Sequence, residues 1–572
     1  MAVRPFSKYD GKERSSYLSA PKPAMIVNTE LHSTVSDPGT FERWRGRVRS
    51  PVLPRTLATF AVLFAFTVLL QIASGAYRSE FGSYPDEPAH YVTSLMVREY
   101  LKAPDLLHPL AFAENYYAHY PKVAIGHWPP VFYIVQSVWM LLFSASRVSI
   151  RLELAFTTAL LALSLYSETK RQFGVNAARL GAFLLICLPL VQSCTDQEMS
   201  ETLLMLFCFW SAVFFARYLV SEHWKDNMWF GIFLSLAVLT KGNGWLLCLI
   251  PPVALPLAHK VSLILRRSFW VSVLIVAVLC LPWQLMTMGV AAKGWTGGSV
   301  PSLHYTLTAL GAFAVIIVRM TGLALFALGA LGILIQVGQP LVRGKRVAPV
   351  PAVMLGLILA TWVFHSLVPA GVEDRKMVIA APALILFLIA GLFWLADHLP
   401  VLGSRTMWRR GLLTAVAGGL FVAETFAVPH DRQFGYIQAA RFIVAHPEFH
   451  DARVLSSSNS IGEGLLVSEI AMLEPRPTVT IVRATKTLAR MNWDGSSYQS
   501  LISSPEDVLA SLSRSNIALV VVDRWPLESQ FPHNKVLLKT IETNPSHFQL
   551  LATFAGENRS PAGQIRVFRF RQ

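Results

Sequence analysis

The chain has 572 residues, of which 53% are hydrophobic and 15% are charged, and its mean hydropathy is +0.45. Soluble globular proteins carry about 25% charged residues, so this composition excludes a soluble protein and predicts an integral membrane protein. The net charge of +15 does not indicate a nucleic-acid partner, because much of the Lys and Arg stands in short clusters between apolar segments, where membrane topology places it.

The polar segment 1–52 ends in the basic stretch FERWRGRVRS and predicts a disordered cytoplasmic tail rather than a cleavable signal peptide. A spanning helix needs about 20 apolar residues. Candidate spans run over residues 54–76, 151–167, 177–194, 201–220, 227–240, 244–258, 268–289, 320–338, 348–370, 377–396 and 411–428. Two further apolar segments, 128–146 and 304–318, are ambiguous.

Basic clusters decide how these segments are oriented, because short cytoplasmic loops are rich in Lys and Arg. If 128–146 and 304–318 lie along the outer surface, the clusters ETKRQFG, VRGKR and RTMWRR all fall inside. This choice predicts about eleven spans, a cytoplasmic amino terminus and a first external loop at 77–150. We therefore expect a polytopic α-helical membrane domain at 53–428.

The pattern changes after residue 430. Short β-rich segments such as TVTIVRA, ALVVVD and IRVFRF alternate with helix-like stretches at 435–446, 505–514 and 534–543. This alternation predicts an extracytoplasmic α/β domain at 430–572. The segment SIGEGLL is too weak to indicate a phosphate-binding loop. The five cysteines contain no CxxC pair, so neither a disulfide framework nor a zinc ribbon is expected.

Charged residues of both signs collect at the predicted outer ends of the spans. Charge so close to hydrocarbon is costly, so this set indicates a site for a charged substrate, although each member alone is compatible with a solvated loop. The set comprises Asp86, Glu87, His90, His127, Arg147, Arg151, Asp196, Glu198, Glu201, Lys241, Glu373, Asp374, Arg375 and Lys376.

Asp86 and Glu87 are adjacent, and on a helix their side chains diverge by about 100°. We therefore expect them to have different roles, one as a proton acceptor and the other in support. Pro85 and Pro88 flank the pair and favour a turn before residue 88. His90 either orients a substrate or is an ordinary loop histidine.

Cationic residues stand at several of the predicted outer ends of the spans. In GHWPPVFYIVQSVWMLLFSASRVSIRLELAF, Arg147 and Arg151 follow the apolar surface helix; Lys241 stands in VLTKGNGW, and Arg375 stands in VPAGVEDRKMVIAAP. Guanidinium groups pair readily with phosphate. We expect Arg151 to do so and Arg147 to extend toward lipid headgroups.

Together these motifs resemble the membrane-embedded GT-C glycosyltransferases, and most closely the family that unites protein O-mannosyltransferases with the lipid A aminoarabinose transferase. The resemblance covers about residues 55–400 and rests on the order of its motifs. These are the DE pair in the first external loop, Pro129-Pro130 before Arg151-Leu152, Asp196 at the start of the fourth span, TKG at 240–242 and EDRKMVIAAP. His127 stands where many relatives have Lys, and Lys376 where an aromatic residue is common.

The resemblance implies an inverting transferase that takes a sugar from a polyprenyl monophosphate and needs no metal or cofactor. Asp86 would be the general base and Glu87 its support. Arg151, Lys241 and Arg375 would bind the lipid phosphate. The implied substrate-binding set is His90, His127, Arg151, Asp196, Lys241, Glu373 and Arg375.

The expected partners are the lipid-linked donor, an acceptor glycan, lipid or protein, and membrane lipids, in a bacterial inner or plasma membrane. Two other classes share this topology. A secondary transporter or flippase tends to have broken helices and charges near the bilayer midplane. An envelope-polysaccharide ligase would use a lipid diphosphate and would be less expected to carry the early acidic pair.

Overall fold

The computed structural model describes residues 52–105, 107–124, 126–295, 301–398, 434–474, 476–491, 497–523, 531–556 and 563–571, with a few positions between 411 and 419. The expected tail at 1–52, the basic segment at 405–410 and the span at 411–428 lie almost entirely outside these residues.

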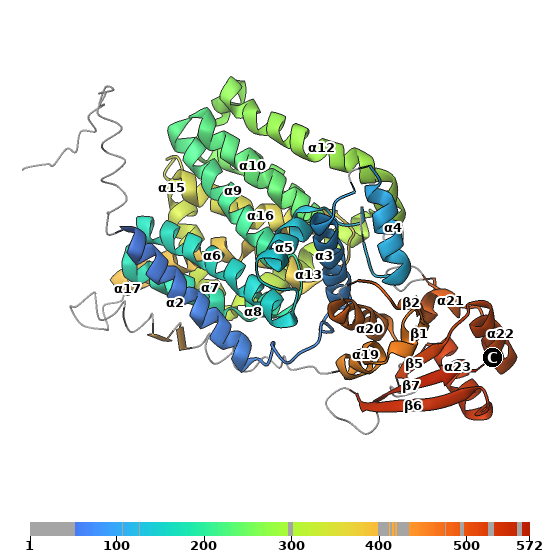
Figure 1. Cartoon of the computed structure of the whole chain (residues 1–572). Coiled ribbons are helices and arrows are strands. Elements are labelled where there is room, and N and C mark those ends of the chain that lie inside the picture. The colour runs from blue at the N-terminus through green and yellow to red at the C-terminus, as the bar shows by residue number, and fades with distance from the viewer. Residues whose placement is uncertain are drawn as a thin grey trace, which may run out of the picture. The chain divides into compact units, whose positions relative to one another are not determined.

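Eight helices among the described residues are long and apolar enough to cross a membrane, and a bent pair makes a ninth candidate (Figure 1). The chain is therefore an integral membrane protein. The eight candidate spans are Pro54–Ala73 of α2 (Val52–Ala73), Arg147–Phe173 (α6), Glu201–Ser221 (α9), Arg267–Gly289 of α12 (Arg267–Trp295), Leu303–Thr321 (α13), Leu323–Val342 (α14 to α15), Pro349–Leu367 (α16) and Asp374–His398 (η4 and α17).

The bent pair consists of α7 (Val175–Cys187) and α8 (Pro189–Asp196), which meet at 59°. Pro189 explains the break, because it disfavours the helical conformation of the preceding residue. Leu188 is accordingly extended, with ψ 121°. The predicted continuous span at 177–194 is therefore two helices.

Several predicted segments form shorter elements. The span expected at 227–240 is α10 (Trp224–Thr240), and the one expected at 244–258 is a 3₁₀ helix, η1 (Gly242–Leu249), followed by α11 (Ile250–Leu257). Within 128–146, α5 (Val131–Leu142) has only 12 residues, too few to cross a bilayer. The segment 304–318, expected at the surface, lies in α13, which is long and apolar enough to span.

Small residues bring α14 (Leu323–Ile333) and α17 (Ala381–His398) together. A Cβ at Gly332 would overlap the carbonyl of Phe387, and a Cβ at Gly391 would overlap the carbonyl of Leu328. Close packing of this kind replaces the hydrophobic driving force that spanning helices lack within lipid.

The segment between α2 and α6 contains α3 (Glu87–Lys102), α4 (Pro109–His119) and α5. Asp86 is the N-cap residue of α3, and Pro88 lies in the first turn, where a missing N–H costs nothing. The flanking prolines thus start a helix directly after Asp86.

The carboxyl-terminal region forms the predicted α/β fold (Figure 1). Its sheet has the order β2-β1-β5-β7-β6. The strands β1 (Arg453–Ser457), β2 (Thr480–Arg483) and β5 (Leu519–Asp523) are parallel, and β7 (Gln564–Phe570) is antiparallel to β5 and to β6 (Phe548–Ala555). The expected helices are α19 (Tyr436–Ala445), α22 (Pro505–Arg514) and α23 (Pro532–Thr543).

Sequence reasoning missed α20 (Ser460–Leu473), which contains the SIGEGLL segment. Asn459 caps this helix by accepting hydrogen bonds from the backbone N–H groups of Ile461 and Gly462. Helix α20 packs against α3 (Figure 1), and Gly464 makes the contact close, since a Cβ there would lie 3.0 Å from Pro88 Cγ.

Polar contacts also join the carboxyl-terminal region to the first loop. Glu80 accepts hydrogen bonds from the backbone of Tyr436 (3.4 Å) and Ile437 (3.1 Å). Arg147 pairs with Glu469 of α20 and its side chain is only 11% exposed. The expectation that Arg147 extends to lipid headgroups is therefore wrong, because a buried carboxylate from a distant part of the chain takes its charge.

Candidate active site

Arg375 is the centre of a charged cluster at one end of the helix bundle. Its guanidinium pairs with Glu373 through Nε (2.5 Å), with Glu201 through Nη1 (3.4 Å) and with Asp86 through Nη2 (3.6 Å). The guanidinium also lies 4.0 Å from the centre of the Tyr84 ring, and the Tyr84 hydroxyl donates to Glu373 (3.0 Å). One cation thus holds carboxylates from three separate parts of the chain.

Lys241 completes this cluster. It follows the last residue of α10, and Glu201 begins α9, so antiparallel packing of α9 and α10 brings the two to the same end. Lys241 Nζ lies 2.6 Å from Glu201 Oε1, with its side chain 19% exposed. We call Asp86, Glu201, Lys241, Glu373 and Arg375 the Asp86 cluster.

Asp86 keeps access to solvent while lying among cations. Its side chain is 29% exposed. Burial raises the pKa of Asp86 above its usual value, and the charges of Arg375, Lys241 and Lys122 oppose that rise. A carboxylate with a raised pKa that remains reachable is a suitable proton acceptor.

The Glu87 side chain lies outside the Asp86 cluster, as the divergence of about 100° between adjacent helical residues predicts. Its carboxylate is fully buried and accepts hydrogen bonds from the backbone N–H of Tyr84 (3.0 Å) and Glu198 (2.8 Å). Arg151 is also fully buried, with Nη2 3.4 Å from Glu87 Oε2 and its guanidinium 5.0 Å from the Phe81 ring centre. Arg151 and Glu87 therefore hold the loop in place, and Arg151 presents no exposed atom to a ligand.

The two expected histidines lie near the charges of the Asp86 cluster, but burial disfavours the charged form of both. His90 is buried, stacks on Trp128 at 4.2 Å and shares a 2.9 Å hydrogen bond with the Tyr133 hydroxyl. Burial lowers the pKa of His90 to about 3, so this imidazole is neutral at physiological pH. His127 is half-buried, and burial likewise lowers its pKa.

The remaining expected residues fall into two groups. Lys376 donates to the carbonyls of Ala370 (2.5 Å) and Gly371 (2.7 Å), while Asp374 is exposed. Asp196 and Glu198 are buried beside the Glu87–Arg151 pair rather than in the Asp86 cluster. Gln71 of α2 fixes this neighbourhood by donating 3.0 Å hydrogen bonds to the carbonyls of Arg151 and Thr195.

Lys122, which sequence reasoning did not select, stands beside Asp86. It lies between the cluster and α20, since a Cβ at Gly464 would be 3.0 Å from Lys122 Cε. Burial and then the nearby Arg483 lower the pKa of Lys122 to about 7, against the opposing effects of Glu463 and Asp86. Only the PK dipeptide at 121–122, shortly before the HWPP motif, could have marked it in the sequence.

A metal site is not evident at this end of the bundle. Among the described residues, no group of three or more His, Cys, Asp or Glu side chains is placed to hold a metal ion. The carboxylates of the Asp86 cluster are instead neutralised by Arg375 and Lys241.

Comparisons with known proteins show which family model part of this chain matches. Residues 127–285 match the family model described as dolichyl-phosphate-mannose-protein mannosyltransferase. No curated protein sequence matches the chain. The matched segment contains Arg151, Asp196 and Lys241 but neither Asp86 nor Arg375.

Two solved structures share the fold at low sequence identity. The crystal structure of ArnT from Cupriavidus metallidurans bound to undecaprenyl phosphate aligns with a TM-score of 0.55 and 14% identity, covering 89% of this chain and 97% of that one. The archaeal oligosaccharyltransferase AglB from Archaeoglobus fulgidus, in complex with an inhibitory peptide and a dolichol-phosphate, aligns with a TM-score of 0.55 and 14% identity, covering 90% of this chain and 74% of that one. The chain thus has the GT-C fold that it shares with these two structures, and its residues 127–285 are similar to the dolichyl-phosphate-mannose-protein mannosyltransferase family model.

Proposed function

We propose that this protein transfers a sugar from a polyprenyl monophosphate carrier to an acceptor hydroxyl at the end of the bundle that carries the Asp86 cluster. The observation that carries this proposal is the pairing of an accessible carboxylate with cations at a membrane end. Both solved neighbours were captured with polyprenyl phosphates, undecaprenyl phosphate in ArnT and dolichol-phosphate in AglB.

The reaction would begin with the acceptor hydroxyl beside Asp86. As general base, Asp86 takes the hydroxyl proton while the oxygen attacks the anomeric carbon. The bond from that carbon to the phosphate oxygen breaks, and the electron pair leaves with the polyprenyl phosphate. Attack opposite the leaving group inverts the anomeric centre. Phosphate is an adequate leaving group when cations neutralise its charge, so the proposal requires no metal.

Three cations are available for that neutralisation. Lys241 and Arg375 line the cluster and remain 19% and 16% exposed. Lys122 supplies a third positive charge near Asp86 while it is protonated, below a pH of about 7. Arg151 would act indirectly, because its pairing with Glu87 fixes the start of α3 and hence the place of Asp86.

The proposed location is the extracytoplasmic face, and the carboxyl-terminal region would lie there too. At the other end of α9, Glu222 pairs with Lys260 and Arg266, which places basic clusters opposite the Asp86 cluster. Lys and Arg favour cytoplasmic loops. Helix α20 packs on α3 beside Asp86, so the carboxyl-terminal region would also limit how an acceptor approaches.

The test is turnover by the purified full-length protein in detergent. Polyprenyl monophosphate sugars and polyprenyl diphosphate sugars would be offered in parallel, and release of the lipid phosphate would be measured for the wild type and for Asp86→Asn. We expect turnover of a monophosphate donor that the variant loses. Preference for a diphosphate donor would favour a polysaccharide ligase, and normal turnover by Asp86→Asn would refute the assignment of the base.

A further inference from the structure

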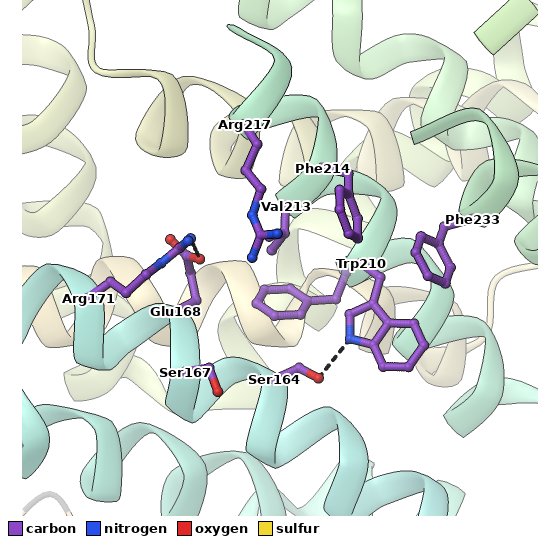
Figure 2. Close-up of a pocket in the computed structure, with 10 residues that line it drawn as sticks. Ser164, Ser167, Glu168, Arg171, Trp210, Val213, Phe214, Arg217 and Phe233 are labelled. Atoms are coloured by element: carbon purple, nitrogen blue, oxygen red, sulfur yellow. Dashed lines mark hydrogen bonds and ion pairs between the residues drawn. The ribbon is translucent and has the colours of Figure 1, made fainter. Parts of the chain in front are cut away.

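A pocket lies between α6, α9 and α10, and none of the residues that line it belongs to the Asp86 cluster (Figure 2). Its volume is about 330 Å³. The residues that matter to its chemistry are Glu168 and Arg171 from α6, Trp210, Phe214 and Arg217 from α9, and Phe233 from α10. We call it the aromatic pocket.

Helix geometry places the aromatic pocket at the opposite end of the bundle from the Asp86 cluster. At a rise of about 1.5 Å per residue, Arg217 lies about 24 Å along α9 from Glu201, and Arg171 lies about 30 Å along α6 from Arg151. A bilayer hydrocarbon core is about 30 Å thick. If Arg151 and Glu201 lie at one headgroup layer, these lengths carry Arg171 and Arg217 close to the opposite headgroup layer.

The aromatic wall of the pocket is held in a fixed position. Trp210 Nε1 donates to the Ser164 hydroxyl (2.7 Å), which itself donates to the carbonyl of Leu160 (2.7 Å). The Trp210 and Phe233 rings meet edge to face at 5.0 Å, and Phe214 stacks on Phe233 at 5.5 Å. This wall offers an apolar surface against which an acyl chain or a glycerol backbone can lie.

The charged rim carries a net positive charge. Glu168 is buried, pairs with Arg171 and accepts a hydrogen bond from Gln172 (3.1 Å), so the charge of Arg171 is largely balanced. Arg217 is exposed and lies 4.9 Å from the centre of the Phe214 ring, and no ion pair to it occurs within the described part of the chain. Figure 2 shows Arg217 reaching from α9 toward the space between the Phe214 ring and the Glu168–Arg171 pair.

We propose that the aromatic pocket binds the headgroup of an anionic phospholipid from the leaflet opposite the Asp86 cluster. Its phosphate would lie between Arg217 and Arg171, and the start of its acyl chain would lie along Trp210 and Phe233. Basic pockets between spanning helices are a recognised form of headgroup site. The proposal does not depend on the transferase reaction, because none of the residues concerned belongs to the Asp86 cluster.

The experiment measures lipid retention by the purified full-length protein with native mass spectrometry. Phosphatidylglycerol and phosphatidylcholine would be titrated separately into wild type, Arg217→Ala, Arg217→Lys and the matched control Lys170→Ala. Lys170 is exposed, immediately precedes Arg171 and does not line the pocket. Thermal unfolding in detergent would confirm that each variant is folded.

We expect the wild type to retain phosphatidylglycerol about tenfold more tightly than phosphatidylcholine, because both lipids offer a phosphate to Arg217 but only phosphatidylcholine also brings a quaternary ammonium against this positive charge. Arg217→Ala should lose this preference, Arg217→Lys should keep part of it, and Lys170→Ala and Asp86→Asn should keep it fully. Equal retention of the two lipids would overturn the proposal. An equal loss of the preference for phosphatidylglycerol in Arg217→Ala and Lys170→Ala would also overturn it, because it would show a general attraction of the lipid to the basic face. Full displacement of the lipid by soluble glycerol phosphate would overturn it as well.

Discussion

Replacing each of the adjacent carboxylates by its amide should give opposite results, because Asp86 and Glu87 lie in different environments. Asp86→Asn removes the proposed base and leaves its shape unchanged. Loss of a general base lowers the rate by about 10² to 10⁴, which corresponds to about 3 to 5.5 kcal/mol of activation free energy. The ion pair that it weakens is 3.6 Å long and partly exposed, so the free energy of unfolding should fall by less than about 1 kcal/mol.

Glu87→Gln should instead damage stability. Its carboxylate and the Arg151 guanidinium are both fully buried, and leaving one buried charge unpaired costs about 3 to 5 kcal/mol. We expect this variant to unfold at a clearly lower temperature in detergent than the wild type or Asp86→Asn.

The two variants are to be compared by donor turnover and by thermal unfolding on the same preparations. An active Asp86→Asn protein would refute the role of Asp86. A Glu87→Gln protein as stable as the wild type would refute the view that the Glu87–Arg151 pair holds the loop, and an inactive but fully stable one would move the catalytic role to Glu87.

Three other predictions follow from named contacts. Burial lowers the pKa of Lys122 to about 7, so its ammonium loses a proton as the pH rises through 7. The KM for the donor should therefore increase above pH 7 in the wild type but stay constant in Lys122→Arg. Identical pH profiles of KM in the two proteins would exclude Lys122 from phosphate binding. Gly391→Leu should destabilise the bundle by several kcal/mol, because even a Cβ there overlaps the Leu328 carbonyl of α14. At the control position Gly411 a Cβ meets nothing within 4 Å, so Gly411→Ala should leave the unfolding temperature unchanged. Chelation with EDTA should leave donor turnover unchanged, and a loss restored by added divalent cation would contradict the metal-free mechanism.

Much of the fold follows from local patterns that any reader of the sequence can see. Continuous apolar segments determined the membrane class, because no soluble fold hides so much hydrophobic surface with so few charges. Alternating segments after residue 430 predicted the strands that became β1, β2, β5, β6 and β7. The helix α20 was missed because its glycines and the preceding serines are typical of loops, and packing on α3 outweighs that local preference.

The sequence selected Asp86, Lys241 and Arg375, which the structure brings into one cluster. It also selected Arg151, which pairs with Glu87 instead, and it did not select Lys122. The distribution of basic clusters brought Asp86, Lys241 and Arg375 to one end, because a span can only return its residues to one face or the other. Which carboxylate meets which cation depends on helix rotation and on contacts between distant segments, which no local pattern encodes. Only the tertiary structure showed that Arg151 is committed to Glu87, that Glu469 takes the charge of Arg147 and that Lys122 stands beside Asp86.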